Sequence, residues 1–433
     1  MKSKELLFWI WLAENLGAAP RDFKHLYSLN DSPYEFFRME ESEIEPLVGI
    51  SSKTKQALAN KDLRRASDIL ARCEREGYGV VTYGDEAYPA LLREIDRPPV
   101  LLYYAGTYPN FATHLTLGIV GTRRMSAYGL RTAYKISYEL SSIGALIVSG
   151  MAAGIDGVAA CAALDAGQAT VAVLGCGLDQ VYPRHHGPLM QAIREGGVLL
   201  SEYSPGTKPN FYNFPIRNRI ISGISHGTVV VEAGVGSGSL ITANEAVRQG
   251  RDVFALPANV GAIGAEGTNG LLRDGARMVL EARDIVAPYQ FLFSETLRPE
   301  EISRVEERSK PDLARLAALG VIELGTGEEA PKKEPAKLAS GSPMKKAGAG
   351  KRRSESETPP PMPTASVPTP DATLASLSSV QRAVLDAIPD DATVTADALC
   401  NLGYPYGESI AALTTLEILG LVVKLPGALY KKA

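Results

Sequence analysis

The chain has few of the residues that build metal sites or disulfide frameworks. Its 433 residues include only five histidines, which are scattered, and four cysteines. The cysteines are far apart in the sequence and show no paired spacing, at Cys73, Cys161, Cys176 and Cys400. This argues against a zinc ribbon or a disulfide framework and fits a reducing cytoplasm. We therefore expect a cytoplasmic protein with neither a metal nor a cofactor.

Long apolar runs are also absent. Near the N-terminus, Lys2 and Lys4 precede an apolar run at 6–13, an arrangement that mimics a signal peptide. The run is short and Glu14 follows it at once, so we expect a buried first helix instead. No other stretch approaches the length of a membrane span, and we expect no membrane partner.

The charge balance gives no overall attraction to nucleic acid, because the formal net charge is −4. Any nucleic-acid site must then be a local basic patch. Nucleotide fingerprints are missing too. Arg123 and Arg124 stand where a dinucleotide would need small residues, and no Walker lysine pattern occurs.

Two carboxylates are candidates for a catalytic role. Asp156 follows a glycine-rich loop and is expected to cap the next helix rather than act as a base. Glu232 ends a predicted strand and is the best remaining catalytic candidate, although a buried, hydrogen-bonded carboxylate is the commoner explanation for such a residue.

Composition and periodicity divide the chain into five segments. The first is helical and contains Leu47-Val48-Gly49-Ile50, which resembles half of a helix-hairpin-helix turn. The predicted segments are a SAM- or helix-hairpin-helix-like helical domain at 1–80, a connector at 81–114, a Rossmann-like domain at 115–288, a charged segment with a disordered Pro/Ala/Lys/Ser-rich linker at 289–373, and a winged-helix domain at 374–433.

The third segment alternates apolar strands with helices. Strands are predicted at 115–120, 145–149, 170–174, 197–201, 228–231, 252–256 and, more briefly, near 278–280. This order predicts an α/β fold with a doubly wound, parallel, Rossmann-like sheet, flanked by the N-terminal helical domain and the C-terminal winged helix. Ligands bind such sheets beyond the carboxyl ends of the strands.

The stretch 210–243 concentrates features of a phosphate site at that edge. It contains a basic turn at 214–219, a buried strand, and a Gly/Ser loop at 234–239 that opens a helix. The loop and the helix N-terminus favour an anion, although the small residues could also serve only to close a tight turn. Phe211, Tyr212 and Phe214 offer faces on which bases of a single strand can stack.

The C-terminal segment is expected to contact protein rather than DNA. Its predicted third helix, at 407–419, contains no Lys or Arg, whereas a helix that binds the DNA backbone should be basic. The linker before it is rich in Lys and Arg at 332–353, which could be either a solvated tether or a DNA contact.

Seven motifs resemble the DNA-processing protein A (DprA/Smf) family. They are IVGTRR at 119–124, SGMAAGIDG at 149–157, AVLGCGLDQVYPRHH at 172–186, LLSEYSPG at 199–206, NFPIRNRIISGIS at 213–225, VVVEAGVGSGSLITA at 229–243 and EGTNGLLRDGA at 266–276. The resemblance covers the whole chain apart from the linker. It implies a single-stranded-DNA-binding homodimer that protects incoming DNA and loads RecA recombinase during bacterial natural transformation.

The family's strand-binding turn matches Gly121, Thr122 and Arg123, and its basic residue after the VYP motif matches Arg184. Met125 departs from the family's usual proline, and Leu256-Pro257-Ala258 replaces a usual VPG. Residues and resemblance together give a candidate DNA site of Gly121, Thr122, Arg123, Arg124, Gly154, Arg184, Lys208, Phe214, Arg217, Asn218, Arg219, Ser237, Gly238 and Ser239.

An enzyme is the alternative hypothesis. The sheet and the Gly/Ser loop also resemble nucleoside-monophosphate phosphoribohydrolases, which carry a PGGxGTxxE loop. Here the loop reads AGVGSGSLITANE at 233–245, without the Pro-Gly-Gly start. We therefore expect a binding protein rather than an enzyme.

Overall fold

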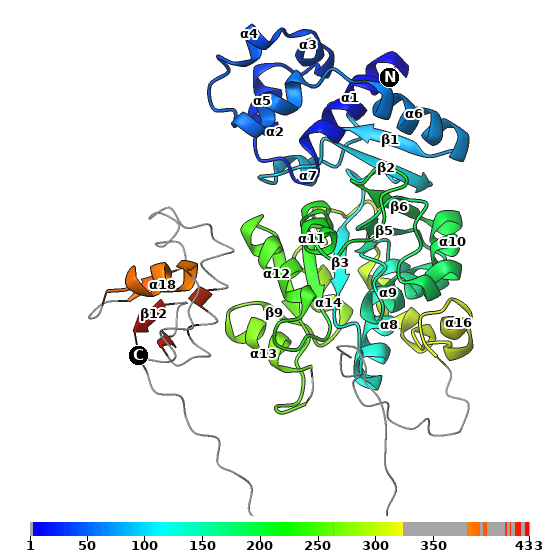
Figure 1. Ribbon diagram of the computed structural model, residues 1–433. Helices are drawn as coiled ribbons and strands as arrows, with labels where there is room; N and C mark the ends of the chain where they lie inside the picture. Colours follow the sequence, from blue (N-terminus) through cyan, green and yellow to red (C-terminus); the bar gives the residue numbers. More distant parts are fainter. Residues whose placement is uncertain are drawn as a thin grey trace, which may run out of the picture. The chain divides into compact units, whose positions relative to one another are not determined.

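The structure is a computed structural model that describes residues 3–262, 264–323, 379–389, 393–395, 412–413, 416, 421–425 and 429–432. The chain divides into two compact units, Met1–Lys332 and Lys333–Ala433. The first contains the N-terminal helices and a large sheet, and the second contains a small sheet (Figure 1).

The large sheet has nine strands in the order β1-β2-β6-β5-β4-β3-β7-β8-β9. Its strands are β1 Gly79–Thr82, β2 Leu101–Gly106, β3 Thr116–Val120, β4 Leu146–Ser149, β5 Thr170–Leu174, β6 Val198–Ser201, β7 Gly227–Val230, β8 Asp252–Ala255 and β9 Arg277–Met278. The chain moves outward from β3 to β6 and then returns to the other side of β3 at β7. The crevice between β3 and β7 is therefore the topological switch point of the sheet.

The parallel sheet predicted for residues 115–288 is present, and two antiparallel strands extend it into a larger, mixed sheet. From β6 through β9 the strands are parallel, whereas β2 pairs antiparallel with β6 and β1 antiparallel with β2. Both added strands come from the segment predicted as a connector. They cover the edge of β6, which would otherwise present unpaired N–H and C=O groups.

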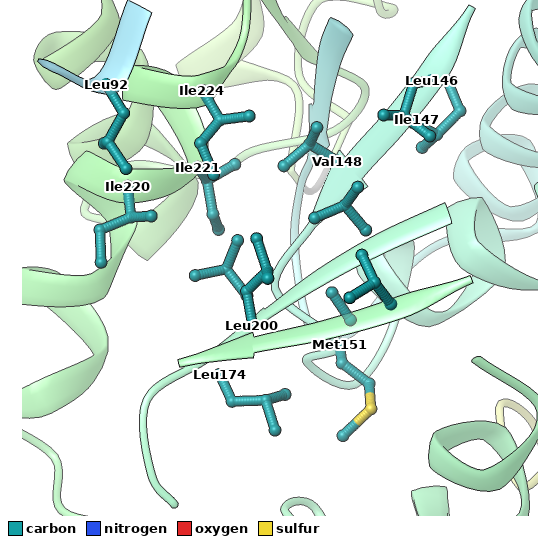
Figure 2. Packing of buried hydrophobic residues seen from close by; sticks show 14 of the residues in the cluster. Leu92, Leu146, Ile147, Val148, Met151, Leu174, Leu200, Ile220, Ile221 and Ile224 are labelled. Carbon is teal, nitrogen blue, oxygen red and sulfur yellow. The ribbon is translucent and has the colours of Figure 1, made fainter. Parts of the chain in front are cut away.

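Helices cover both faces of the parallel part. They are α8 Ala127–Ser142, α9 Ile155–Asp165, α10 Gly187–Gly196, α11 Asn213–Ile224, α12 Gly238–Arg248, α13 Glu266–Arg273 and α14 Ala282–Val286. Helix α8 packs against α9, and α11 packs against α12. Figure 2 shows Ile220, Ile221 and Ile224 of α11 near the sheet residue Leu200, in the buried hydrophobic core.

The predicted basic turn at 214–219 is helical, because it forms the first two turns of α11. Pro215 is the third residue of that helix. The first four N–H groups of an α-helix have no intrahelical partner, so a proline there costs no hydrogen bond. The proline therefore marks the start of a helix and not a loop.

The N-terminal helices belong to the same compact unit as the sheet. They are α1 Ser3–Leu16, α2 Phe23–Leu29, α3 Pro33–Arg38, α4 Glu41–Ile44, α5 Ser52–Ala59 and α6 Arg64–Glu76, and α7 Ala90–Glu94 lies between β1 and β2. Trp9, Ile10, Trp11 and Leu12 are buried, as expected of a core helix. These residues share one continuous hydrophobic core with the sheet.

A segment after the sheet also packs on this unit. It contains α15 Ile302–Val305 and α16 Leu313–Ala318. Leu316 is fully buried, Arg315 forms an ion pair with Asp165 of α9, and Ser309 donates a hydrogen bond of 3.1 Å to Glu139 of α8. The first part of the predicted charged segment is therefore structured.

The described part of the second unit contains α18 Ser379–Asp386 and the strands β10 Val394–Thr395, β11 Val422–Leu425 and β12 Leu429–Lys432, in the order β10-β12-β11. Strands β11 and β12 are antiparallel. Its small core is made by Val384, Leu385, Ile388, Ala412, Leu413, Leu416, Val422 and Tyr430. Most of the predicted helix at 407–419 lies outside the described residues.

Candidate nucleic-acid interface

A pocket of about 480 Å³ opens at the switch point of the sheet. Four segments line it: the turn after β3, the loop that leads into α9, the first turns of α11 and the N-terminus of α12. All four follow carboxyl ends of parallel strands, where a doubly wound sheet places its ligands. Ten of the fourteen predicted site residues line the pocket: Gly121, Thr122, Arg123, Arg124, Phe214, Arg217, Asn218, Ser237, Gly238 and Ser239. Gly154 is not among them, but it packs behind the turn after β3.

The turn after β3 presents two free cations on a fixed backbone. The Thr122 N–H donates to the Glu232 carbonyl at 2.7 Å, and the Thr122 carbonyl accepts from the Ile155 N–H at 3.2 Å. Gly154 passes behind the turn with a φ of +82°, and a Cβ there would overlap the Thr122 carbonyl. The turn is thus held by its backbone, and the side chains of Arg123 and Arg124 are not needed to hold it. Both side chains are exposed, where a guanidinium could donate to a phosphate.

Gly121 must lack a side chain because a neighbouring helix packs closely against it. A Cβ at this position would lie 2.5 Å from Cγ1 of Ile155 on α9. The sequence placed the glycine correctly in the turn, but it could not show which neighbour excludes a side chain.

The opposite wall is the N-terminus of α12. Ser237 caps the helix, since its hydroxyl accepts from the Ser239 N–H at 3.4 Å and lies 2.8 Å from the Ser239 hydroxyl. Asn218 of α11 donates to the Gly238 carbonyl at 3.2 Å, which joins the two walls. The helix N-terminus carries partial positive charge, so the wall favours an anion beside the arginines of the opposite turn.

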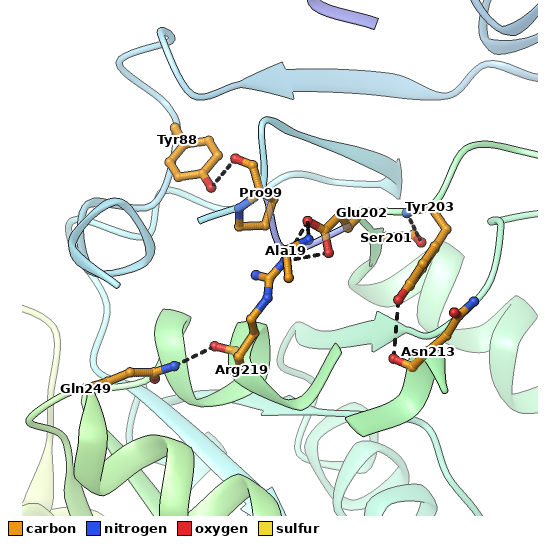
Figure 3. A network of polar contacts seen from close by, with 9 residues as sticks. All are labelled: Ala19, Tyr88, Pro99, Ser201, Glu202, Tyr203, Asn213, Arg219 and Gln249. Atoms are coloured by element: carbon orange, nitrogen blue, oxygen red, sulfur yellow. Dashed lines mark hydrogen bonds and ion pairs between the residues drawn. The ribbon is translucent and has the colours of Figure 1, made fainter. Parts of the chain in front are cut away.

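The two arginines of α11 are buried, each 3% exposed. Arg217 lines the pocket and donates from Nη1 to the carbonyls of Gly150, at 2.8 Å, and of Val173. Arg219 lies outside the pocket, where its Nη2 is 2.5 and 2.6 Å from the two carboxylate oxygens of Glu202 (Figure 3). The structure therefore does not bring Arg219 to the predicted site. Residues two apart on a helix point to different faces. Because the sequence predicted a turn at 214–219, both arginines were expected at one site.

Two further predicted cations, Arg184 and Lys208, are exposed but do not line the pocket. Arg184 begins the short helix η1 Arg184–His186, directly after the segment that carries Tyr182.

The aromatic residues have unequal roles. Phe211 and Tyr212 are each 80% exposed, and Phe211 lines the pocket. Phe214 is half-buried: Tyr182 stacks on it with ring centroids 4.8 Å apart, and a Cβ at Gly175 would lie 2.7 Å from its ring. Phe211 is therefore the open stacking surface, and Phe214 is part of the pocket wall.

Several lining residues were absent from the predicted set, including Ala152, Ile241 and Thr242. Asp156 also lines the pocket; the sequence analysis had treated it only as a helix cap. Asp156 lies at the start of α9, the helix that follows β4, and therefore at the same edge of the sheet as the other site residues. This position in the predicted strand–loop–helix order could have identified it as a pocket residue. Burial raises the pKa of Asp156, although Arg217 and the N–H groups of Ala152 and Gly150 oppose the rise.

Glu232 does not face a reaction centre. Its carboxylate oxygen Oε2 accepts from the N–H and hydroxyl of Ser126, at 3.0 and 3.1 Å, at the N-terminus of α8. This is the buried, hydrogen-bonded carboxylate that the sequence left as the commoner explanation. Among the described residues that line the pocket, Asp156 is the one carboxylate, and its neighbour is a guanidinium.

The described part of the chain holds no group of three or more His, Cys, Asp or Glu side chains placed to share a metal ion. Cys73, Cys161 and Cys176 are free and buried, and burial raises the pKa of the Cys73 thiol to about 11. Across residues 3–323 and the described parts of the second unit, no helix has the length and apolarity to cross a membrane.

The fold and the pocket define a Rossmann-like protein whose switch point opens into a pocket lined by exposed arginines and a helix N-terminus. Two family models match the chain. The model of the DNA recombination-mediator protein A matches residues 79–290, which begin at β1, and the model of the DprA winged helix domain matches residues 368–428.

Relatives extend the match. The DNA processing protein DprA of Bacillus subtilis is 39% identical over 217 residues, which are 50% of this chain and 73% of that protein. Protein Smf of Synechocystis is 30% identical over the full length of both chains. The X-ray structure of DprA from Streptococcus pneumoniae superposes with a TM-score of 0.57 and 32% identity, over 65% of this chain and 97% of that one. The chain belongs to the DNA-processing protein A (DprA/Smf) family, a family of DNA processing and recombination.

Proposed function

We propose that the chain binds single-stranded DNA in the switch-point pocket. The observation that carries the proposal is the arrangement of the exposed guanidinium groups of Arg123 and Arg124 opposite the N-terminus of α12, with the exposed ring of Phe211 beside them. Cations that follow a backbone and rings on which bases stack are what a single strand requires. The free cations Arg184 and Lys208 extend this surface beyond the pocket.

A competition experiment tests this proposal. A labelled single strand bound to the protein is challenged with unlabelled single strand or duplex of equal length, at one stated salt concentration. We expect the single strand to compete better, with little dependence on its sequence. Arg123→Ala should weaken binding, and the control Arg64→Ala, which removes an exposed cation of the N-terminal helices, should not. Equal competition by duplex would overturn the proposal.

We also propose that the protein acts in the cytoplasm as a homodimer that protects incoming single strands and loads RecA on them during natural transformation. Support comes from membership of a family described as recombination mediators. The test is RecA-driven strand exchange on DNA that is already coated with single-strand-binding protein. We expect exchange to depend on this protein and to be reduced by Arg123→Ala. Exchange that is equally fast without the protein would contradict RecA loading.

The phosphoribohydrolase alternative has weaker support. A hydrolase needs a carboxylate free to act on the bond that breaks, and the one carboxylate among the described lining residues lies beside Arg217. Release of free base from a nucleoside monophosphate, at a rate that Asp156→Asn abolishes, would favour the enzyme instead.

A further inference from the structure

Arg217 is a buried cation in the middle of a pocket whose other arginines are exposed. It is 3% exposed, and the hydrogen bonds of its guanidinium are to the protein. Nη1 donates to the carbonyls of Gly150 and Val173, and Nε donates to Asn218 Oδ1 at 3.2 Å. A phosphate ligand would instead need guanidinium N–H groups that face the solvent.

The two carbonyls belong to neighbouring parallel strands. Gly150 directly follows β4, and Val173 lies in β5, next to it in the sheet. The guanidinium lies flat against Gly150, because a Cβ there would be only 2.6 Å from Nη2. One side chain of α11 therefore spans the carboxyl ends of two strands. A lysine could not reproduce this contact, since an ammonium lacks the planar fork of a guanidinium.

The charge of Arg217 is balanced inside the protein. Burial lowers the pKa of Arg217, and the negative charge of Asp156 opposes this effect. Asp156 also accepts a 3.1 Å hydrogen bond from the Gly150 N–H. Gly150 is thus held on its carbonyl side by Arg217 and on its N–H side by Asp156. Phe214 and Asn218, which flank Arg217 on α11, both line the pocket.

We propose that Arg217 is a positioning residue: it fixes the first turns of α11 and the loop after β4 as the walls of the pocket, with Asp156 as its partner, and it does not bind the strand. This inference rests on the proposed binding of single-stranded DNA in that pocket. It assigns Arg123 and Arg217 different tasks, because Arg123 meets phosphate and Arg217 shapes the site that phosphate enters.

The test compares Arg217→Met, Arg217→Lys and Arg123→Met in the full chain. Single-strand affinity is measured over a series of salt concentrations, and amide hydrogen exchange is measured in the free protein. We expect Arg217→Met to weaken binding roughly tenfold, the scale of lost hydrogen bonds to a charged group, with an unchanged log-log salt slope. Arg123→Met should instead reduce that slope by about 0.7. Arg217→Lys should behave like Arg217→Met.

Hydrogen exchange separates positioning from a general loss of stability. In Arg217→Met we expect faster exchange at residues 150–154 and 213–218, and wild-type rates in α1 and α6. The double variant Asp156→Asn/Arg217→Met removes both charges, so it tests the same prediction if the single variant does not fold. A slope reduced by about 0.7 in Arg217→Met or in the double variant, or wild-type binding by Arg217→Lys, would overturn the proposal. If the wild type binds no single strand, the proposed function fails, while the exchange rates still test Arg217.

Discussion

The turn after β3 and the helix α11 both bring a pair of arginines to the carboxyl edge of one sheet, yet they use them in opposite ways. Arg123 and Arg124 are exposed on a turn whose backbone is already satisfied. Arg217 and Arg219 are buried, and both are bonded to protein acceptors. The comparison teaches that an arginine at this edge can meet a phosphate only if the fold leaves the N–H groups of its guanidinium without a protein acceptor.

The largest expected effect concerns the buried pair of Arg219 and Glu202. Arg219→Ala leaves the Glu202 carboxylate buried without its cation, and breaking such a pair costs about 3–5 kcal/mol of unfolding free energy. The same change at Arg123 should alter stability by less than about 0.5 kcal/mol. Urea unfolding of both variants measures the difference. If Arg219→Ala and Arg123→Ala had equal unfolding free energies, the distinction between buried and exposed arginines would be contradicted. The variant Arg219→Met/Glu202→Met should recover much of the loss.

The next effect concerns base stacking. Phe211→Ala removes the exposed ring at the pocket, and we expect a loss of about 1–3 kcal/mol of binding free energy if one base stacks there. Because stacking involves no phosphate, the salt slope should stay unchanged. The matched control is Tyr212→Ala, which removes an equally exposed neighbour that does not line the pocket. A larger loss from Tyr212→Ala would move the stacking surface to that residue.

The salt dependence sharpens the comparison of the arginines themselves. Four exposed cations, Arg123, Arg124, Arg184 and Lys208, should give a log-log slope of roughly −3 in total, at about −0.7 for each contact with a single strand. Arg123→Ala should remove about 0.7 of that slope and weaken binding to all sequences alike. A titration of wild type and variant at several salt concentrations measures both. Unchanged affinity and slope in a folded Arg123→Ala protein would remove the turn from the site.

The smallest expected effect is that of the C-terminal part of the chain. Deleting residues 326–433 should change single-strand affinity by less than about 0.5 kcal/mol, because the proposed contacts lie within 121–242 and surface changes elsewhere are usually of this size. Fluorescence anisotropy of the truncated and full chains makes the comparison. Loss of nearly all affinity would show that the basic linker or the winged helix holds the DNA.

Much of the fold could be predicted because its signals are local. Seven strands of the sheet and the helices between them follow from alternation of apolar runs with glycine-ended loops, and the turn Gly121–Arg124 lies at the edge where the pocket opens. The resemblance to the DprA/Smf family is confirmed by both family models. The prediction that this pocket binds DNA stays a prediction.

What the sequence could not supply was set by contacts distant in the chain. The burial of Arg219 depends on Glu202, which lies on a segment after β6, and that of Arg217 on carbonyls of Gly150 and Val173. The antiparallel pairing of β2 with β6 joins segments about a hundred residues apart, and no local pattern encodes it. Exposure of a cation is therefore the property that sequence reasoning predicts least well at this site.

Helix α11 is secured on two faces, by Arg217 toward the strands and by Arg219 toward Glu202, which also accepts from the Ala19 N–H at 3.0 Å. Such a wall has little conformational freedom left to lose when a ligand arrives. For the proposed single-stranded DNA, the entropy lost on association should then fall almost wholly on the DNA. The pocket is already formed in the free protein, so no slow opening needs to precede binding. We expect capture to proceed in one kinetic phase whose observed rate rises linearly with protein concentration, without the plateau that a slow opening of the pocket would impose.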